Sequence, residues 1–309
     1  MGGVGGMCRA ELSGAEFDPL AIGDSVTVKL DSGGGMLTVF TGEVSAFAAG
    51  AGAQSLTALD GVAKLAGREV SGAYEDVSLD SIIKDLISQA GATAGEVCTG
   101  PQVPFYAVHR TPTLLVQLRT LAEACGADIY SKGDGKVHVA TPGQGASEHS
   151  FQFGENVLFL ELARVQLPWD SVEVWGEGAA SSQGADKAHW LTADLSGVSG
   201  KAALSESGSV SGGKLGSRPR LIRDGALRSG GAAEDSAKAR MTWLATRRLS
   251  GRLEAYGASA VMPGDHVKLE KLPAQHAAAT LLSAGGPLRV RGVRHLLDRA
   301  RGLVTRLEF

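Results

Sequence analysis

Residues 253–309 have the sequence LEAYGASAVMPGDHVKLEKLPAQHAAATLLSAGGPLRVRGVRHLLDRARGLVTRLEF, in which three strand-like runs surround two turns. In the turn at 262–265, MPGD, proline fixes φ and glycine permits positive φ, so the runs on either side are predicted to form a hairpin. Apolar residues alternate with basic or polar ones in 288–295 and again in 303–309. We therefore predict the closing sheet of a β-barrel, with one buried face and one cationic face.

The composition fits a chain built mainly of strands. With 309 residues, of which 43% are hydrophobic and 20% charged, the chain can bury a large core in two or three domains. It has 43 glycines and only 5% aromatic residues, which fits many short strands and turns better than a helical bundle. We predict a mainly β chain of the α+β class.

Charge is distributed unevenly along the chain. Residues 1–214 carry 13 basic and 25 acidic side chains, a net charge of −12, whereas residues 215–309 carry 17 and 8, a net charge of +9. This asymmetry indicates contacts between acidic and basic surfaces of an assembly, or the solvated faces of ordinary strands. The arginines follow strands without interleaved aromatic residues, so sequence-specific nucleic-acid binding is not expected.

The cysteine pattern and the hydropathy point to a protein that folds in the cytoplasm. Cys8, Cys98 and Cys125 are odd in number and far apart, which indicates neither a disulfide framework nor a zinc site. No apolar run approaches the roughly 18 residues that span a bilayer. The N-terminus lacks a charged region followed by an apolar core, so we expect no signal peptide and no membrane span.

Changes in the spacing of apolar residues divide the chain into parts. Strand and turn patterns run to Leu59, with a glycine turn at 33–35. Amphipathic helices are predicted from Ser78 to Gly91 and from Thr111 and Pro112 to Gly126, which places Cys125 in a core, followed by a hairpin at 133–135. The predicted parts are 1–74, the first part of a β-barrel; 75–148, an inserted small α+β domain; 149–230, barrel completion and a long connection; and 231–309, a linking helix and a second barrel.

Two stretches of the later parts have a distinct composition. Residues 177–217 are rich in Ser, Gly and Ala, and we predict a partly mobile connection with Trp190 as its tether. Residues 234–250 are predicted to form the longest helix, with acidic residues in the first turn and arginines in the last.

Catalytic and cofactor motifs are weak. The stretch 208–215 nearly matches a phosphate-binding loop, but Leu215 replaces the hydroxyl that would hold magnesium, so a flexible loop is preferred. The seven histidines show no metal-type spacing. The pairs Glu75–Asp76 and Glu234–Asp235 lie at helix starts, where the helix dipole accounts for them. We predict no catalytic residue, no metal and no cofactor, and only a lysozyme-like carboxylate pair stays open.

Several short motifs together resemble one known family. They are Phe17-Asp18-Pro19, the runs 22–26 and 39–44, and then the helix, strand, helix and hairpin of the insertion. This order resembles the phage late control protein D family, the baseplate hub of contractile tails. Similar motifs recur at 114–130, 262–267 and 290–309. The positions that match the family are Phe40, Gly42, Gly126, Pro263, Gly264, Asp265, His295 and Phe309.

The resemblance implies a structural role without enzymatic activity. It implies a homotrimer in which each chain supplies two tube-like barrels, giving a pseudo-sixfold ring that adapts a sixfold tail tube to a threefold spike. The partners would be the tail-tube ring above, a spike protein below and other baseplate components, with DNA or cargo passing through the channel. Because the chain ends on a strand at Phe309, the spike is expected to be a separate polypeptide. The glycine-rich N-terminus stands where family members have an extra strand, so whether the first barrel closes within one chain is left undecided.

The implied location is the baseplate of a virion or injection particle, assembled in the bacterial cytoplasm. The same hub architecture begins the valine-glycine repeat (VgrG) spike proteins of type VI secretion. The alternatives are therefore a VgrG-like carrier subunit and, from another functional class, a tail-associated peptidoglycan hydrolase. Open edge strands would supply the pairing between chains in the ring.

Overall fold

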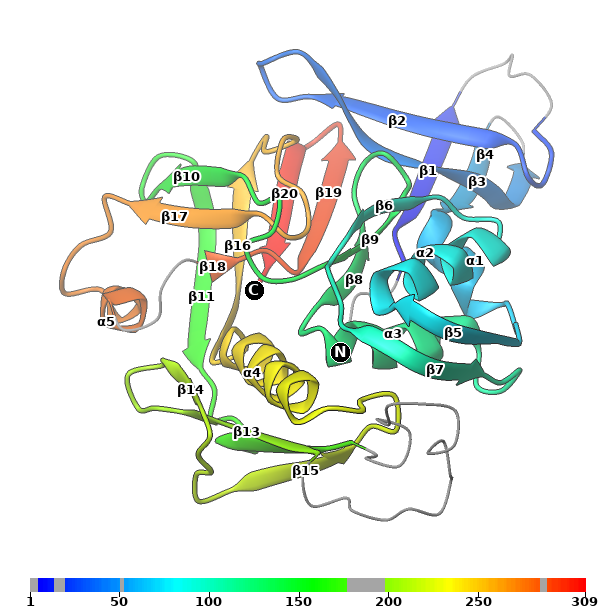
Figure 1. The fold of residues 1–309 in the computed structure, drawn as a ribbon. Helices are drawn as coiled ribbons and strands as arrows, with labels where there is room; N and C mark the ends of the chain where they lie inside the picture. Colours follow the sequence, from blue (N-terminus) through cyan, green and yellow to red (C-terminus); the bar gives the residue numbers. More distant parts are fainter. Residues whose placement is uncertain (1–4, 14–19, 51–52, 177–197, 284–287) are drawn as a thin grey trace.

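The computed structural model describes residues 5–13, 20–50, 53–176, 198–283 and 288–309. The chain is mainly β, as predicted, and its strands form several separate sheets around three helix-containing regions (Figure 1). No helix in the described ranges has the length and apolar character needed to cross a bilayer.

The first sheet is an antiparallel sheet in the order β1-β4-β3-β2. The strands of this sheet are β1 (Met7–Ser13), β2 (Ser25–Asp31), β3 (Met36–Gly50) and β4 (Ala53–Leu59). The glycine turn predicted at 33–35 joins β2 to β3, and the predicted meander of this region is confirmed. Register shifts between Val28 and Lys29 and between Val44 and Ala46 curve the sheet locally.

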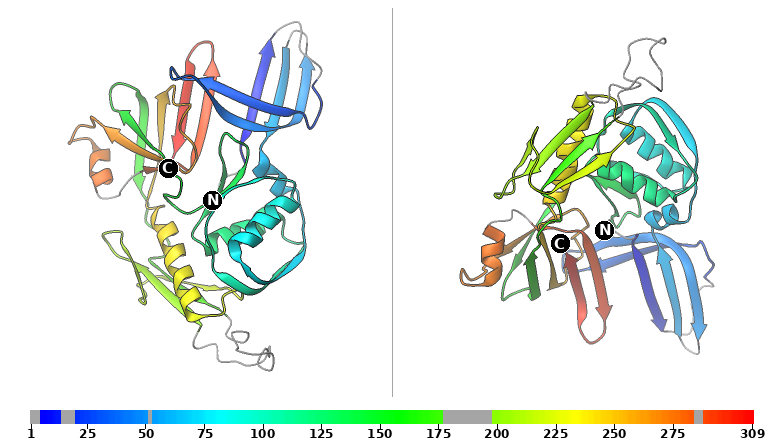
Figure 2. Two further views of the ribbon diagram at one scale, coloured as in Figure 1. Left: turned by 45° about the horizontal axis from the view of Figure 1, so that its top comes forward. Right: turned by 90° about the horizontal axis from the view of Figure 1, so that it is seen from below.

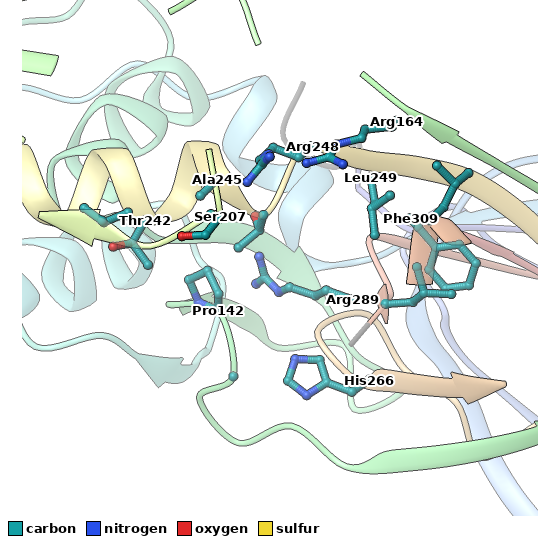
Figure 3. Close-up of a pocket in the computed structure, with 16 residues that line it drawn as sticks. Pro142, Arg164, Ser207, Thr242, Ala245, Arg248, Leu249, His266, Arg289 and Phe309 are labelled. Carbon is teal, nitrogen blue, oxygen red and sulfur yellow. The ribbon is translucent and has the colours of Figure 1, made fainter. Parts of the chain in front are cut away.

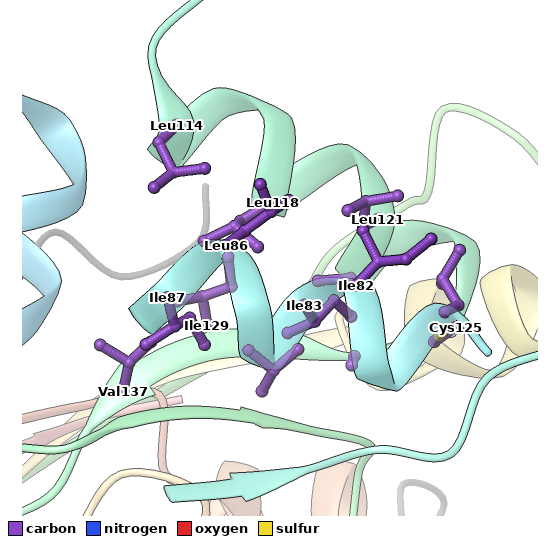
Figure 4. Packing of buried hydrophobic residues seen from close by; sticks show 14 of the residues in the cluster. Ile82, Ile83, Leu86, Ile87, Leu114, Leu118, Leu121, Cys125, Ile129 and Val137 are labelled. Atoms are coloured by element: carbon purple, nitrogen blue, oxygen red, sulfur yellow. The ribbon is translucent and has the colours of Figure 1, made fainter. Parts of the chain in front are cut away.

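The next unit contains three helices and two small sheets, β5-β7 and β6-β9-β8. Its elements are α1 (Gly61–Ala66), β5 (Gly72–Ser78), α2 (Leu79–Gln89), β6 (Ala94–Val97), β7 (Gln102–Val108), α3 (Leu114–Ala124), β8 (Asp128–Ser131) and β9 (Val137–Ala140). Figure 4 shows the side chains of α2 and α3 interleaved above β8 and β9, with Cys125 at the end of the same core, as predicted. This core also includes Val62 and Leu65 of α1.

The helix α3 begins later than predicted. Thr113, not Thr111, is the N-cap of α3. The Gln117 amide donates to the carbonyl oxygens of His109 and Pro112 at 2.6 and 2.8 Å, which holds the preceding residues as a loop outside the helix. The helix therefore begins two residues beyond the sequence prediction.

A third unit packs α4 against the sheet β14-β13-β12-β15. Its elements are β12 (Ser171–Trp175), β13 (Ser199–Leu204), β14 (Val210–Gly212), β15 (Pro219–Arg223) and α4 (Gly230–Ala245). The prediction of a connection without regular structure is wrong for residues 199–212, where β13 and β14 form a hairpin. Trp190 and the other residues from 177 to 197 lie outside the described part of the chain.

This hairpin was not predicted because it consists largely of small residues. A side-chain carbon on Gly200 would collide with the backbone of Ala233 and Glu234 in α4. Glycine thus allows β13 to approach the helix closely, without the apolar alternation that marks an ordinary strand. The helix α4 itself begins four residues before the predicted start, where Ser229 accepts a hydrogen bond from the Ala232 amide at 3.2 Å.

The last unit has two sheets, in the orders β11-β16-β20-β19 and β10-β17-β18. Its elements are β10 (Glu148–Gln152), β11 (Val157–Arg164), β16 (Leu249–Tyr256), β17 (His266–Glu270), α5 (Ala277–Ser283), β18 (Leu288–Arg289), β19 (Gly292–Asp298) and β20 (Gly302–Glu308). The closing hairpin of β19 and β20 is confirmed.

The predicted hairpin around residues 262–265 is wrong. Strand β16 pairs with β11 and β20, whereas β17 pairs in parallel with β10 and antiparallel with β18. The turn instead carries the chain from one sheet to the other, and the amide of Gly264 donates to the carbonyl of Val290 at 2.8 Å. The single strand predicted for 288–295 is likewise divided between β18 and β19.

Candidate assembly surface

The first sheet leaves much apolar surface uncovered. Met36 is 69% exposed, Met7 56% and Phe47 48%. The three large clusters of buried apolar residues lie in the other units, and the buried apolar residues of this sheet are Val44, Leu56 and Ala58. Since sheets normally bury one apolar face, this one offers a surface suited to a further protein chain.

Two sheets also end in open edge strands. In the described residues β2 pairs with β3 alone, and β19 pairs with β20 alone. Figure 2 shows the first sheet and the β19–β20 hairpin side by side at the same end of the molecule. The hydroxyl oxygens of Ser32 and Ser259 lie 2.7 Å apart and join the β2–β3 turn to the last unit. Open edges at one end can pair with strands of another chain.

Asp60 fastens the first sheet to the α+β unit. Its carboxylate accepts hydrogen bonds from the amide of Gly6 at 2.6 Å and from those of Val62 and Ala63 at 3.0 and 3.2 Å. The residue therefore caps α1 and holds the chain beside β1 at the same time. Burial raises the pKa of Asp60 above its usual value, against the opposing effect of these hydrogen bonds. Asp60 thus fixes the end of the first sheet that adjoins α1.

Phe40 and Gly42 belong to the same junction. A side-chain carbon on Gly42 would collide with the carbonyl oxygen of Leu59 and lie 2.7 Å from the Phe40 ring, so only glycine fits beside the ring. On the neighbouring residue, the Thr41 hydroxyl donates to the carbonyl of Gly133 at 2.8 Å. The β8–β9 hairpin therefore docks directly on β3.

Pro263, Gly264 and Asp265 lie together in the turn between the two sheets of the last unit. Asp265 is 4% exposed, and its carboxylate accepts from the amides of Met262 and Ser147 at 2.9 and 3.1 Å. It also lies 2.9 Å from Nε2 of His149. These contacts tie the turn to the start of β10 and make Asp265 a structural carboxylate.

The other matched positions lie apart from this turn. Gly126 has a φ of +66° and ends α3 where a side chain would collide with the backbone of Ala239 in α4. Nδ1 of His295 lies 2.9 Å from the Thr305 hydroxyl on the partner strand, and burial lowers the pKa of His295 to about 4. Phe309 is buried, and its amide donates to the carbonyl of Gly251 at 3.0 Å.

The eight positions therefore do not converge on one reaction centre in the described residues. They lie at packing junctions between sheets, helices and turns. No group of three or more His, Cys, Asp or Glu within the described ranges is arranged to hold a metal.

Two buried ionic networks were not predicted from the sequence. Arg240 of α4 donates to Asp224 at 3.0 Å and lies 3.6 Å from Glu123. Asp128 accepts from Arg247 at 3.1 Å and from Arg289. Burial alone would raise the pKa of Asp128, but these arginines and a hydrogen bond from Trp243 hold it below its usual value. An arginine within the apolar stripe of α4 was the sequence feature that could have revealed the first network.

The predicted cationic face of the closing sheet is wrong, because acidic and basic residues alternate across it. Arg306 pairs with Glu254 at 2.7 Å, and Arg252 lies 3.9 Å from both Glu161 and Glu254. Arg294, exposed on the edge strand β19, has no carboxylate partner among the described residues. The open edge therefore ends in a positive charge that the described part of the chain leaves unpaired.

Known structures with a similar fold come from phage tails and secretion systems. The 43 kDa tail protein of prophage MuSo2 from Shewanella oneidensis superposes with a TM-score of 0.65 at 15% identity, over 99% of this chain and 90% of that one. A tail protein from Neisseria meningitidis MC58 gives 0.59 at 15% identity, over 98% and 96%. An Escherichia coli component of the type VI secretion system, described as similar to tail proteins of bacteriophage T4, gives 0.57 at 10% identity, over 98% and 68%.

No protein-family model and no curated protein matches the sequence. The likeness therefore rests on the arrangement of the sheets and helices, which extends over nearly the whole chain. This chain has the fold of phage tail proteins.

Proposed function

We propose that this protein is a structural, non-enzymatic hub in the baseplate of a contractile phage tail or a phage-tail-like injection system. The observation that carries the proposal is the uncovered first sheet, which exposes Met7, Met36 and Phe47 beside an open edge strand. The fold of phage tail proteins over nearly the whole chain supports it.

In this proposal three copies close into a ring. Each chain contributes the first sheet and the sheet of β11, β16, β20 and β19, so three chains contribute six sheets around one axis. Pairing of open edges between neighbours would satisfy backbone groups that a single chain leaves free. Such a ring would match a sixfold tail tube on one side and a threefold spike on the other.

Electron microscopy of the purified protein tests this proposal. The expected particle is a threefold ring with an axial channel and six similar modules around it. Addition of a tail-tube protein should give rings stacked on the hub. A particle made of one chain with no axial channel would overturn the proposal.

A carrier subunit of a type VI secretion system is the second candidate. The likeness to the Escherichia coli component, at a TM-score of 0.57, favours it. The two candidates differ in the assembly that binds the ring, so co-purification from the native host separates them. Contractile-tail sheath and tube proteins are expected for the first, and type VI sheath and tube proteins for the second.

A further inference from the structure

A cavity of about 690 Å³ lies between the C-terminal end of α4, the β13–β14 turn and the strands β17 and β18 (Figure 3). Its size falls in the range of sites that hold small molecules, roughly 300–1,000 Å³. None of its described lining residues belongs to the first sheet or to β19, whose exposed surface and open edge the proposed assembly uses.

The wall of the cavity is cationic. Arg164, Arg248, Arg289 and His266 line it, and none of the described lining residues is acidic. In Figure 3 the guanidinium of Arg289 lies between those of Arg164 and Arg248 and the ring of His266. Arg248 donates to the backbone carbonyl of Glu206 at 3.0 Å, and in the described ranges neither Arg164 nor Arg248 pairs with a carboxylate.

Positive charge is also in excess behind this wall. Arg247 and Arg289 share the single carboxylate of Asp128, and Arg291 donates to the carbonyl of Thr246, which also lines the cavity. Burial, together with the neighbouring charges of Arg247 and Arg289, lowers the pKa of Arg291 to about 10. Three guanidinium groups thus surround one carboxylate in a region largely shielded from water.

Arg289 places a buried guanidinium in the wall of the cavity. Its side chain is 6% exposed, and its Nε is buried without a hydrogen-bond partner among the described residues. The planar guanidinium faces the cavity, where an acceptor can lie against it. An oxyanion supplies several such acceptors at once.

The remaining wall is apolar. Leu249, Leu288 and Phe309 line the cavity and are themselves mostly buried. Hydrophobic side chains beside a few charged groups are typical of sites that orient an amphipathic ligand. A bare inorganic ion would leave this part of the cavity unfilled.

We propose that this cavity binds a small organic anion, whose phosphate or carboxylate group lies against Arg164, Arg248 and Arg289 and whose apolar body lies against Leu249, Leu288 and Phe309. Arginine suits this role because its planar fork donates two parallel hydrogen bonds to such an oxyanion. The same chemistry can come from a free metabolite or from an acidic side chain next to an apolar one in a partner protein.

Calorimetry with phenyl phosphate tests the proposal on the full chain in phosphate-free buffer. We expect saturable binding of one ligand per chain, weaker binding of inorganic phosphate and none of phenol. Arg164→Gln and Arg248→Gln should each weaken binding by about tenfold or more, the loss expected for one charge-assisted hydrogen bond. Arg301→Gln is the matched control, because Arg301 lies on the exposed β19–β20 turn, and should leave binding unchanged.

A second probe, the dipeptide acetyl-Glu-Leu-amide, distinguishes a free metabolite from an acidic side chain of a partner protein. Binding of the dipeptide, lost in the same two variants, identifies an acidic side chain of a protein partner. Binding of phenyl phosphate alone identifies a free organic phosphate. Absence of binding by both probes, or binding that persists in the double variant Arg164→Gln/Arg248→Gln, overturns the proposal.

Discussion

A side-chain carbon on Gly264 would lie 2.7 Å from the hydroxyl oxygen of Tyr130. The turn of the last unit therefore packs so closely against β8 of the α+β unit that no side-chain carbon fits at residue 264. Gly264 also has a φ of +97°, which L-residues with a side chain rarely adopt. We expect Gly264→Ala to lower the free energy of unfolding by roughly 2–4 kcal/mol, from backbone strain and steric overlap together. Urea denaturation measures this change.

Gly23→Ala provides the control for that experiment. Gly23 has a φ of +95°, but no atom lies within 4 Å of the position that a side-chain carbon would take there. Only the backbone strain, about 1–2 kcal/mol, is expected at this residue. If the two substitutions destabilise the protein equally, the close packing of Gly264 on Tyr130 makes no contribution.

Arg240 is expected to be the most sensitive charged residue of α4. Its side chain is 5% exposed and donates to Asp224 at 3.0 Å and to Ser236 at 3.1 Å. Arg240→Ala should lower the free energy of unfolding by about 3–5 kcal/mol, because it leaves a partly buried carboxylate without its partner. Lys238→Ala is the control on the same helix, since the pair of Lys238 with Glu234 is exposed to solvent. An equal loss in both variants would show that the buried network has no special role.

Stability should fall with acid in a window set by His295. Burial lowers the pKa of His295 to about 4, whereas an unfolded histidine titrates near 6.5. Between these two values the unfolded chain binds a proton that the folded chain does not, so stability decreases as the pH falls from about 6.5 to about 4. The loss amounts to at most about 3–4 kcal/mol, at roughly 1.4 kcal/mol for each pH unit.

Denaturation midpoints of His295→Gln across this window check that expectation. The variant cannot titrate here, so its stability should depend less on pH than that of the parent chain. His109→Gln alters an exposed histidine and should retain the parental slope. A parental slope in His295→Gln would contradict the assignment.

The three longest helices, α2, α3 and α4, were predictable because their evidence is local, whereas the short helices α1 and α5 were not predicted. In α2 the residues Leu79, Ile82, Ile83, Leu86 and Ile87 recur with helical spacing, and all are buried as expected. The start of α3 was misplaced because the deciding contact, from Gln117 to the carbonyl groups of the preceding loop, is made by a side chain within the helix. Helical periodicity therefore located the helices more reliably than their first residues.

The pairing of strands was harder to predict because it is decided by distant segments. The turn at Gly264 was recognised, but its hydrogen bond to Val290 and the pairing of β17 with β10 were not. Strand β13 was missed because Ser, Gly and Ala pack closely on α4 without an alternating apolar pattern. The cationic cavity was missed for the same reason, since Arg164, Arg248 and Arg289 are brought together only by the fold.

A charge placed on the first sheet should weaken assembly without unfolding the chain. Phe47 is 48% exposed on β3, within the surface that the proposed ring would cover. Phe47→Lys should shift sedimenting material from trimer toward single chains, because a lysine would be buried at the interface without a partner. Val116→Lys alters a residue of similar exposure, 44%, on α3, outside both sheets of the proposed ring, and should leave the trimer intact. Dissociation in both variants would point to general destabilisation.

Assembly should also depend on salt. Residues 1–214 carry a net charge of −12 and residues 215–309 a net charge of +9. Arg294, on the open edge of β19, has no carboxylate partner among the described residues. Contacts between these parts in neighbouring chains would be screened as the Debye length falls from about 10 Å at 0.1 M salt to about 3 Å at 1 M. We expect the trimer to dissociate at higher protein concentration in 1 M sodium chloride than in 0.1 M. Complete insensitivity to salt would exclude this role for the charges.

The mass of the purified protein in solution tests the trimeric hub most directly. Multi-angle light scattering during size-exclusion chromatography should give three times the chain mass of 31.7 kDa. The exposed apolar sheet and the open edge strands would then be covered by neighbouring chains. A stable particle of 31.7 kDa at all concentrations would contradict the account.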